Sequence, residues 1–160
     1  MHKFLIYIMT IISLFIPIVS YSANDAPIKT QKEVVSNAIP ENHKSKIEIK
    51  IEAMENECME KNQTQAGMNN CAGQTFEAWD KALNDVYGKL MKKLDKQGRL
   101  ALKNAQREWL KYRDSHFIFL ETYYEKFDGS MYVGMRIQDK TEIIRDRTLI
   151  LQSLLLLTEL

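Results

Sequence analysis

The sequence is poor in the residues that interrupt regular structure. Its 160 residues include three prolines, at positions 17, 27 and 40, and six glycines that stand singly. Proline breaks helices, and a fold of many short strands needs frequent turns rich in glycine and proline. The proline-free stretch after residue 40 therefore favours long helices over a strand-rich fold.

Net charge is nearly absent as well. The chain has 22 Lys and Arg residues against 21 Asp and Glu residues, which gives a formal charge of +1. Proteins that bind nucleic acids draw much of their affinity from basic residues that neutralise phosphates, and proteins that bind anionic membrane surfaces carry basic clusters. The composition therefore argues against both classes, and we expect no nucleic-acid partner.

Motifs for chemistry are also missing. The three histidines, His2, His43 and His116, do not have the spacing of metal ligands. The chain contains no nucleophile elbow, no phosphate-binding glycine loop and no dinucleotide fingerprint. We therefore expect a protein that is not an enzyme and that uses neither a metal nor a cofactor.

Cysteine is scarce, with Cys58 and Cys71 as the only two. In an exported protein, two thiols are expected to join in a disulfide. The alternative is a redox or metal pair, but twelve intervening residues do not resemble a Cys-x-x-Cys site, and no further zinc ligands are present. We predict a disulfide that stabilises the fold by roughly 3 kcal/mol.

The first 22 residues have the pattern of a secretory signal peptide. Lys3 precedes an apolar run, and the small residues Ser20 and Ser22 suit cleavage after position 22. The alternative is an uncleaved membrane anchor, because the run approaches the ~20 residues that span a bilayer. We expect cleavage, a periplasmic or secreted location and no stable membrane insertion; without a cysteine near the cut, the protein is not a lipoprotein. A polar linker at 23–45 then leads to a folded domain at 46–160.

Apolar residues recur at steps of three and four in two long segments. The first covers 64–94 and the second 102–127, and this spacing is typical of amphipathic helices. A short turn at 95–98 joins them, so the two helices are expected to pack antiparallel. The large aromatic residues of these segments are expected in the core: Trp79, Tyr87, Trp109 and Tyr112.

A break and one further helix follow. Asp128, Gly129 and Ser130 interrupt the second pattern, because glycine suits the left-handed position at the end of a helix. We expect an irregular stretch to about Asp139 and a helix at 141–158.

The segment 46–61 is ambiguous, since its isoleucines alternate as in a strand and also step as in a helix. We interpret it as a helix because a lone strand would lack a partner. The predicted fold is therefore all-α. It is a small helical bundle built on two long antiparallel helices, with a C-terminal helix and a short disulfide-linked N-terminal helix.

Two charged residues fall on or near the apolar faces of the long helices. Asp80 belongs to the first helix and Arg113 to the second. A charge beside a core requires a partner, so we expect an ion pair between Asp80 and Arg113 that sets the register of the two helices.

Three spaced motifs give the chain a resemblance to a known family. They read TQAGMNNCA at 64–72, WDKALN at 79–84 and AQREWLKYRD at 105–114. Over residues 58–149 the sequence resembles the LprI-like lysozyme-inhibitor family of small secreted bacterial proteins. The resemblance implies an all-helical exported domain that inhibits lysozyme. The chain lacks the second cysteine pair of many members, so packing must hold its second half.

An inhibitor of lysozyme needs acidic surface, because most animal lysozymes are strongly basic, and hydrogen-bonding groups that can enter the cleft of the enzyme. Glutamates at 52, 55, 57 and 60 form an acidic stripe beside the cysteines, and the break at 128–130 is a candidate projecting loop. The candidate partner contacts are Glu52, Glu55, Asp128, Gly129, Ser130, Tyr132 and Arg136.

Other interpretations stay open at the level of sequence. A glutamate-rich stretch is also typical of a solvated helix face, and a Gly-Ser break also ends helices without further function. The partner is expected to be a lysozyme or another cell-wall hydrolase. The alternatives are a structural or stress-related cell-envelope protein, an immunity-type binder of another cell-wall enzyme, and a carrier of a small ligand.

Overall fold

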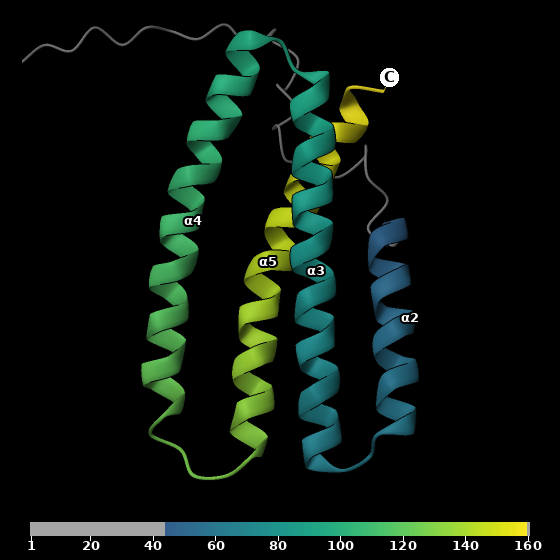
Figure 1. Ribbon diagram of the computed structural model, residues 1–160, viewed down its shortest axis with the longest axis vertical. Coiled ribbons are helices and arrows are strands. Elements are labelled where there is room, and N and C mark those ends of the chain that lie inside the picture. Colours follow the sequence, from purple (N-terminus) through teal and green to yellow (C-terminus); the bar gives the residue numbers. More distant parts are fainter. Residues whose placement is uncertain (1–43, 160) are drawn as a thin grey trace, which may run out of the picture. The chain divides into compact units, whose positions relative to one another are not determined.

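The computed structural model describes residues 44–159, and this part of the chain consists of four helices without a strand. The helices are α2 (Lys46–Lys61), α3 (Gln65–Lys93), α4 (Lys96–Tyr124) and α5 (Met131–Leu157) (Figure 1). The predicted all-α fold is confirmed. The predicted signal peptide and almost all of the predicted linker lie outside the described residues.

Side-chain caps explain where three of the helices begin. The Ser45 hydroxyl accepts a hydrogen bond from the Glu48 amide while the Glu48 carboxylate accepts one from the Ser45 amide, so a capping box starts α2. Thr64 caps α3 and Asp95 caps α4 in the same manner, each through the amide three residues further on. The capping box resolves the ambiguity of segment 46–61 in favour of the predicted helix.

The core lies mainly between α3 and α5. A stripe on α3 that includes Trp79 and Leu83 is buried against a stripe on α5 that includes Ile144 and Leu151. Helix α2 adds Ile51 to the same cluster. Each buried aliphatic side chain of this size stabilises the fold by roughly 1.5–3 kcal/mol, so these three helices carry most of the hydrophobic stabilisation.

Helix α4 packs differently from the expectation. It runs antiparallel to α3, as predicted, but the two helices diverge from their shared turn, and α5 lies between them (Figure 1). Leu120 is the one residue of α4 that is buried. The expected direct packing of the two long helices against each other was wrong, because α5 occupies the surface of α3.

Polar contacts join α4 to α5. Glu121 pairs with Arg136 at 2.5 Å and with Lys140. The Tyr124 hydroxyl donates to the Asp139 carboxylate at 2.7 Å, and this bond raises the pKa of Tyr124 to about 12. Exposed ion pairs contribute little each, so α4 is held less firmly than the α3–α5 core.

The irregular stretch expected as far as Asp139 was wrong, because α5 begins at Met131. Gly129, at a φ of 122°, ends the preceding segment as predicted. Gly134 lies inside α5, where a Cβ atom would come within 2.6 Å of Asn69 Oδ1 on α3. Glycine here permits close packing of α5 against α3.

Among residues 44–159, no helix combines the length and the apolar character needed to cross a bilayer.

Candidate functional site

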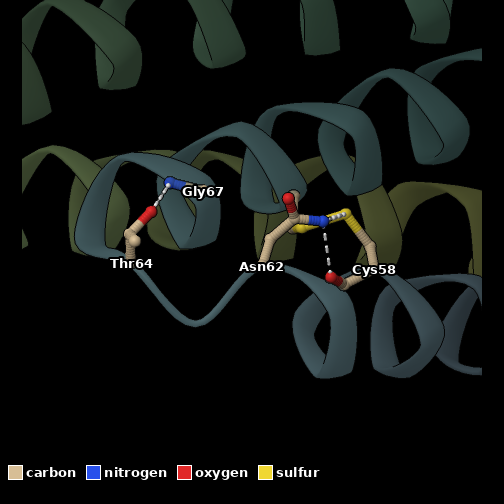
Figure 2. Close-up of a disulfide and its surroundings, with 5 residues drawn as sticks. Cys58, Asn62, Thr64 and Gly67 are labelled. Atoms are coloured by element: carbon tan, nitrogen blue, oxygen red, sulfur yellow. Dashed lines mark hydrogen bonds between the residues drawn. A yellow bond between two sulfur atoms is a disulfide. The ribbon is translucent and has the colours of Figure 1, made fainter.

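A disulfide fixes α2 against the start of α3. Cys58 and Cys71 are bonded, with 5.7 Å between their Cα atoms, which confirms the predicted pair. In the turn between the two helices, the Asn62 side-chain amide donates to the Cys58 carbonyl at 2.9 Å, and the Gly67 amide donates to the Thr64 hydroxyl at 3.1 Å (Figure 2). The covalent bond and these caps hold one wall of the site described next.

A cleft of about 440 Å³ lies between α2 and α5, with α3 as its floor. We call it the α2–α5 cleft. Carboxylates of α2 and α5, side-chain amides of α3 and α5, and four methionines line it, and Trp79, Thr75 and Ala72 form part of the floor. Its volume is within the range of ligand pockets, roughly 300–1,000 Å³.

Three carboxylates gather at the α2–α5 cleft: Glu52 and Glu55 from α2 and Glu142 from α5. Burial raises the pKa of Glu55, and the neighbouring Glu52 and Glu142 carboxylates raise it further. Glu52 pairs with Lys44 at 2.7 Å, and Glu142 pairs with Arg145 at 2.9 Å. Glu55 has no ion-pair partner within the part of the chain that the structure describes, so its charge is compensated least.

Arg145 is already committed to other groups. Its guanidinium donates to Glu48 and to Glu142, each at 2.9 Å, and lies 6.0 Å from the centre of the Trp79 ring. Burial alone would lower the pKa of Arg145, but the hydrogen bonds to Glu142 and Glu48 outweigh burial, so the net effect is a raised pKa. The guanidinium therefore anchors α2 to α5 and stays protonated, and it is not paired with Glu55.

The floor of the cleft contains a buried hydroxyl without a partner. Thr75 is 5% exposed, and its Oγ1 atom makes no hydrogen bond in the described structure. The other two buried threonines, Thr141 and Thr148, lie on α5, and the hydroxyl of each donates to a backbone carbonyl one turn earlier. A buried polar atom without a partner costs free energy, so an unpaired hydroxyl in a cleft wall is a feature that a ligand can relieve.

Methionines form the rim of the cleft. Met59, Met68, Met131 and Met135 line it, and Met131 is 53% exposed. The unbranched thioether side chain adapts to different surfaces, and methionine is enriched where proteins bind varied partners. An acidic cleft with such a rim can receive a positively charged group on an apolar stem.

The candidate partner contacts from the sequence divide between two faces. Glu52 and Glu55 line the cleft, and the Ser130 carbonyl accepts from the Asn69 side chain at 2.8 Å, which places the 128–130 turn at the cleft's end. Tyr132 instead stacks on Phe127, which follows the end of α4, and Arg136 pairs with Glu121 of α4. They do not belong to a projecting loop, because α5 already includes them.

The predicted ion pair between Asp80 and Arg113 is not formed. Arg113 donates to its neighbour Asp114 at 2.6 Å, with its guanidinium 5.7 Å from the centres of the Trp109 and Phe117 rings. Asp80 accepts from Asn84, one turn further along α3, at 3.2 Å. The physical reason is that α4 diverges from α3, so these positions do not meet.

The expected aromatic core is confirmed only in part. Trp79 is 3% exposed and belongs to the core, while Tyr87 and Trp109 pack against it half-buried. Tyr112 is 55% exposed, contrary to expectation, because the face of α4 that carries it is not covered by α3. It begins a chain of contacting aromatic rings that continues through His116 and Phe119.

The described residues contain no cluster of three or more side chains suited to holding a metal ion. The described residues form a small helical domain with one disulfide and an acidic cleft. The family model for lysozyme inhibitor LprI matches residues 58–151, and the chain belongs to this family.

The fold is also similar to a crystal structure of an uncharacterized protein from Burkholderia thailandensis, with a TM-score of 0.64 and 20% sequence identity. The similarity covers 74% of this chain and 57% of that one, so the chain spans little more than half the length of the solved protein. At this identity the similarity shows the fold alone. No curated protein matches the sequence.

Proposed function

We propose that this protein is exported and binds a lysozyme, or a related cell-wall glycosidase, and blocks its activity. Membership of the lysozyme-inhibitor family, over residues 58–151, is the observation that carries the proposal. The expected signal peptide would deliver the chain to the compartment where such enzymes act, which is also where the Cys58–Cys71 disulfide persists.

The α2–α5 cleft is the proposed surface for the enzyme. Many lysozymes are strongly basic, and a negative patch speeds the approach of a basic partner and favours its binding. Glu52, Glu55 and Glu142 concentrate negative charge at the cleft although the whole chain has a formal charge of only +1. Glu57 and Glu60 extend this charge along the outside of α2, where Glu57 pairs with Lys61.

The turn at 128–130 belongs to the same proposed surface. Its Ser130 carbonyl is held by Asn69, a residue of the cleft, so a partner seated over the cleft also meets this turn. Asp128, Gly129 and Ser130 are exposed and offer backbone groups and an acidic side chain. We leave Tyr132 and Arg136 out of the contact surface because their side chains contact Phe127 and Glu121 instead.

The test is a lysozyme activity assay on bacterial cell walls with increasing amounts of the purified protein. We expect saturable inhibition of at least one basic lysozyme, and weaker inhibition at high salt because charge attraction is screened. A large molar excess that leaves several types of lysozyme fully active would contradict the proposal. That result would favour a structural or stress-related role in the cell envelope.

A further inference from the structure

We infer that the α2–α5 cleft is a pocket for one lysine side chain of the bound enzyme, whose ammonium lies among the Glu52, Glu55 and Glu142 carboxylates. The inference rests on the proposed function, because it names the chemical group by which the partner is held. Four observations support it: an uncompensated carboxylate, a buried hydroxyl without a partner, apolar side chains in the lining, and the absence of features suited to other ligands.

The carboxylates of the cleft lack one positive charge. Lys44 pairs with Glu52 and Arg145 with Glu142, whereas no described cation pairs with Glu55. Glu55 is half-buried on α2, and the Glu52 and Glu142 carboxylates are both close enough to raise its pKa. A cation placed here would remove the mutual repulsion of three neighbouring negative groups, and a charge-assisted hydrogen bond to Glu55 would add to this gain.

A second, independent observation is that the buried Thr75 hydroxyl has no hydrogen-bond partner in residues 44–159. Thr75 belongs to α3 and lines the floor of the same cleft. A hydroxyl oxygen accepts a hydrogen bond, and an ammonium has three hydrogens to donate. The carboxylates and Thr75 together therefore offer acceptors from three helices, α2, α3 and α5, to one compact donor group.

The apolar side chains that line the cleft suit the stem of a lysine. Met59 from α2, Met68 from α3 and Met135 from α5 line the cleft together with Ala72. Lysine buries its methylene stem against apolar surface while its ammonium stays with polar groups. Flexible methionines can close around such a stem without a preformed fit.

Other ligands fit the cleft less well. An anion would be repelled by Glu52, Glu55 and Glu142, and the guanidinium of Arg145 is occupied by Glu48 and Glu142. A metal ion lacks a suitable set of three or more ligating side chains in residues 44–159. A single cation on an apolar stem satisfies both the charge and the lining.

The experiment uses NMR spectra of the purified protein with isotope-labelled methionine methyl groups. The probe is Nα-acetyl-lysine N-methylamide, which presents one lysine side chain without a free α-amine or carboxylate. We expect saturable shifts of the Met59, Met68, Met131 and Met135 methyl signals, with a Kd on the order of 1 mM or weaker for one side chain. The norleucine derivative, which has the same four-carbon side chain but lacks the ammonium, should cause no saturable shift.

A matched pair of variants identifies the carboxylate. Glu55→Gln should weaken binding of the lysine probe about tenfold, because it removes a charge-assisted hydrogen bond. Glu60→Gln removes the same charge from an exposed position of the same helix, outside the cleft, and should leave the Kd unchanged. Equal weakening by both variants, or equal shifts with the norleucine derivative, would overturn the inference.

Further arms separate the pocket from the proposed function. If the probe binds but no lysozyme is inhibited, the proposed function fails while the ammonium pocket stands. If a lysozyme is inhibited but the probe leaves the four methyl signals in place, the pocket is wrong and the function stands.

Cadaverine, a free diamine with a similar methylene stem, tests whether a small-molecule amine occupies the pocket in place of a lysine side chain of a protein. Tighter binding of cadaverine than of the lysine probe would contradict a partner side chain as the occupant.

Discussion

Reduction of the Cys58–Cys71 disulfide should lower the free energy of unfolding of the domain by about 3 kcal/mol. The bond joins residues 13 apart in sequence, and the loop-closure entropy of a cross-link of this span corresponds to about 3 kcal/mol at 25 °C. The native state should survive, because α2 also contributes Ile51 to the core and its Glu48 pairs with Arg145. The loss therefore reflects mainly the greater freedom of the unfolded chain.

Urea denaturation followed by circular dichroism measures this effect. With an m-value of roughly 1.5 kcal/mol/M, the midpoint should fall by about 2 M when reductant is added. The variant Cys58→Ala/Cys71→Ala should unfold near the midpoint of the reduced protein, and reductant should not change it further. The double variant thus controls for effects of the reductant itself.

A fall of less than 0.5 M, with unchanged m-value, would refute the loop-closure argument. It would mean that the unfolded chain keeps Cys58 and Cys71 close together without the bond. Loss of helical signal at zero urea on reduction would refute the expectation that noncovalent contacts alone keep α2 packed against the other helices.

Three other perturbations test individual contacts. Burial acts to raise the pKa of Glu48, but hydrogen bonds from Ser45 and Arg145 outweigh burial, so the pKa is lowered. The ionised Glu48 therefore stabilises the fold above about pH 4.5, and this contribution is lost as the pH falls through the folded-state pKa. Glu48→Gln should therefore lower the free energy of unfolding by about 2 kcal/mol at pH 7 and by much less at pH 3. Urea denaturation at the two pH values measures both losses, and equal losses would contradict this prediction. Gly134→Ala should displace the Asn69 side chain from the Ser130 carbonyl, but alanine also stabilises α5 by about 1 kcal/mol through its higher helix propensity. The thermal midpoint should therefore change little, and a large decrease would show that Asn69 cannot move aside. Glu121→Gln should lower the free energy of unfolding by less than about 1 kcal/mol and should increase amide hydrogen exchange in α4 more than in α3. Equal increases in both helices would argue against the looser attachment of α4.

The helices were predictable where local signals act alone. The apolar spacing of α3 and the cap residues before α2, α3 and α4 are short-range features, and they predict helices close to those observed. The start of α5 was not predictable, because Ser130 makes no side-chain cap and the fit of Gly134 against Asn69 depends on a contact 65 residues away in sequence. Periodicity likewise shows that a helix has an apolar face, but it does not show which helix covers that face, so the exposure of Tyr112 was missed.

The candidate site was predictable to a similar extent. Glu52 and Glu55 were identified from the density of glutamates in one segment, a purely local signal. Glu142, Arg145 and Thr75 lie on other helices and join the cleft only through packing, so no spacing in the sequence connects them. Thr75 becomes notable only when hydrogen bonds are counted, because its hydroxyl is the one threonine oxygen buried without a partner in residues 44–159.

Matched charge variants test the proposal that the protein inhibits a lysozyme through the α2–α5 cleft. Glu52→Gln/Glu55→Gln removes two charges inside the cleft, and Glu57→Gln/Glu60→Gln removes two from the outside of the same helix. Isothermal titration against an inhibited lysozyme should show about tenfold or greater weakening for the cleft pair and about twofold or less for the outer pair. Equal affinities for both variants, or no binding by the unaltered protein, would contradict inhibition through this cleft.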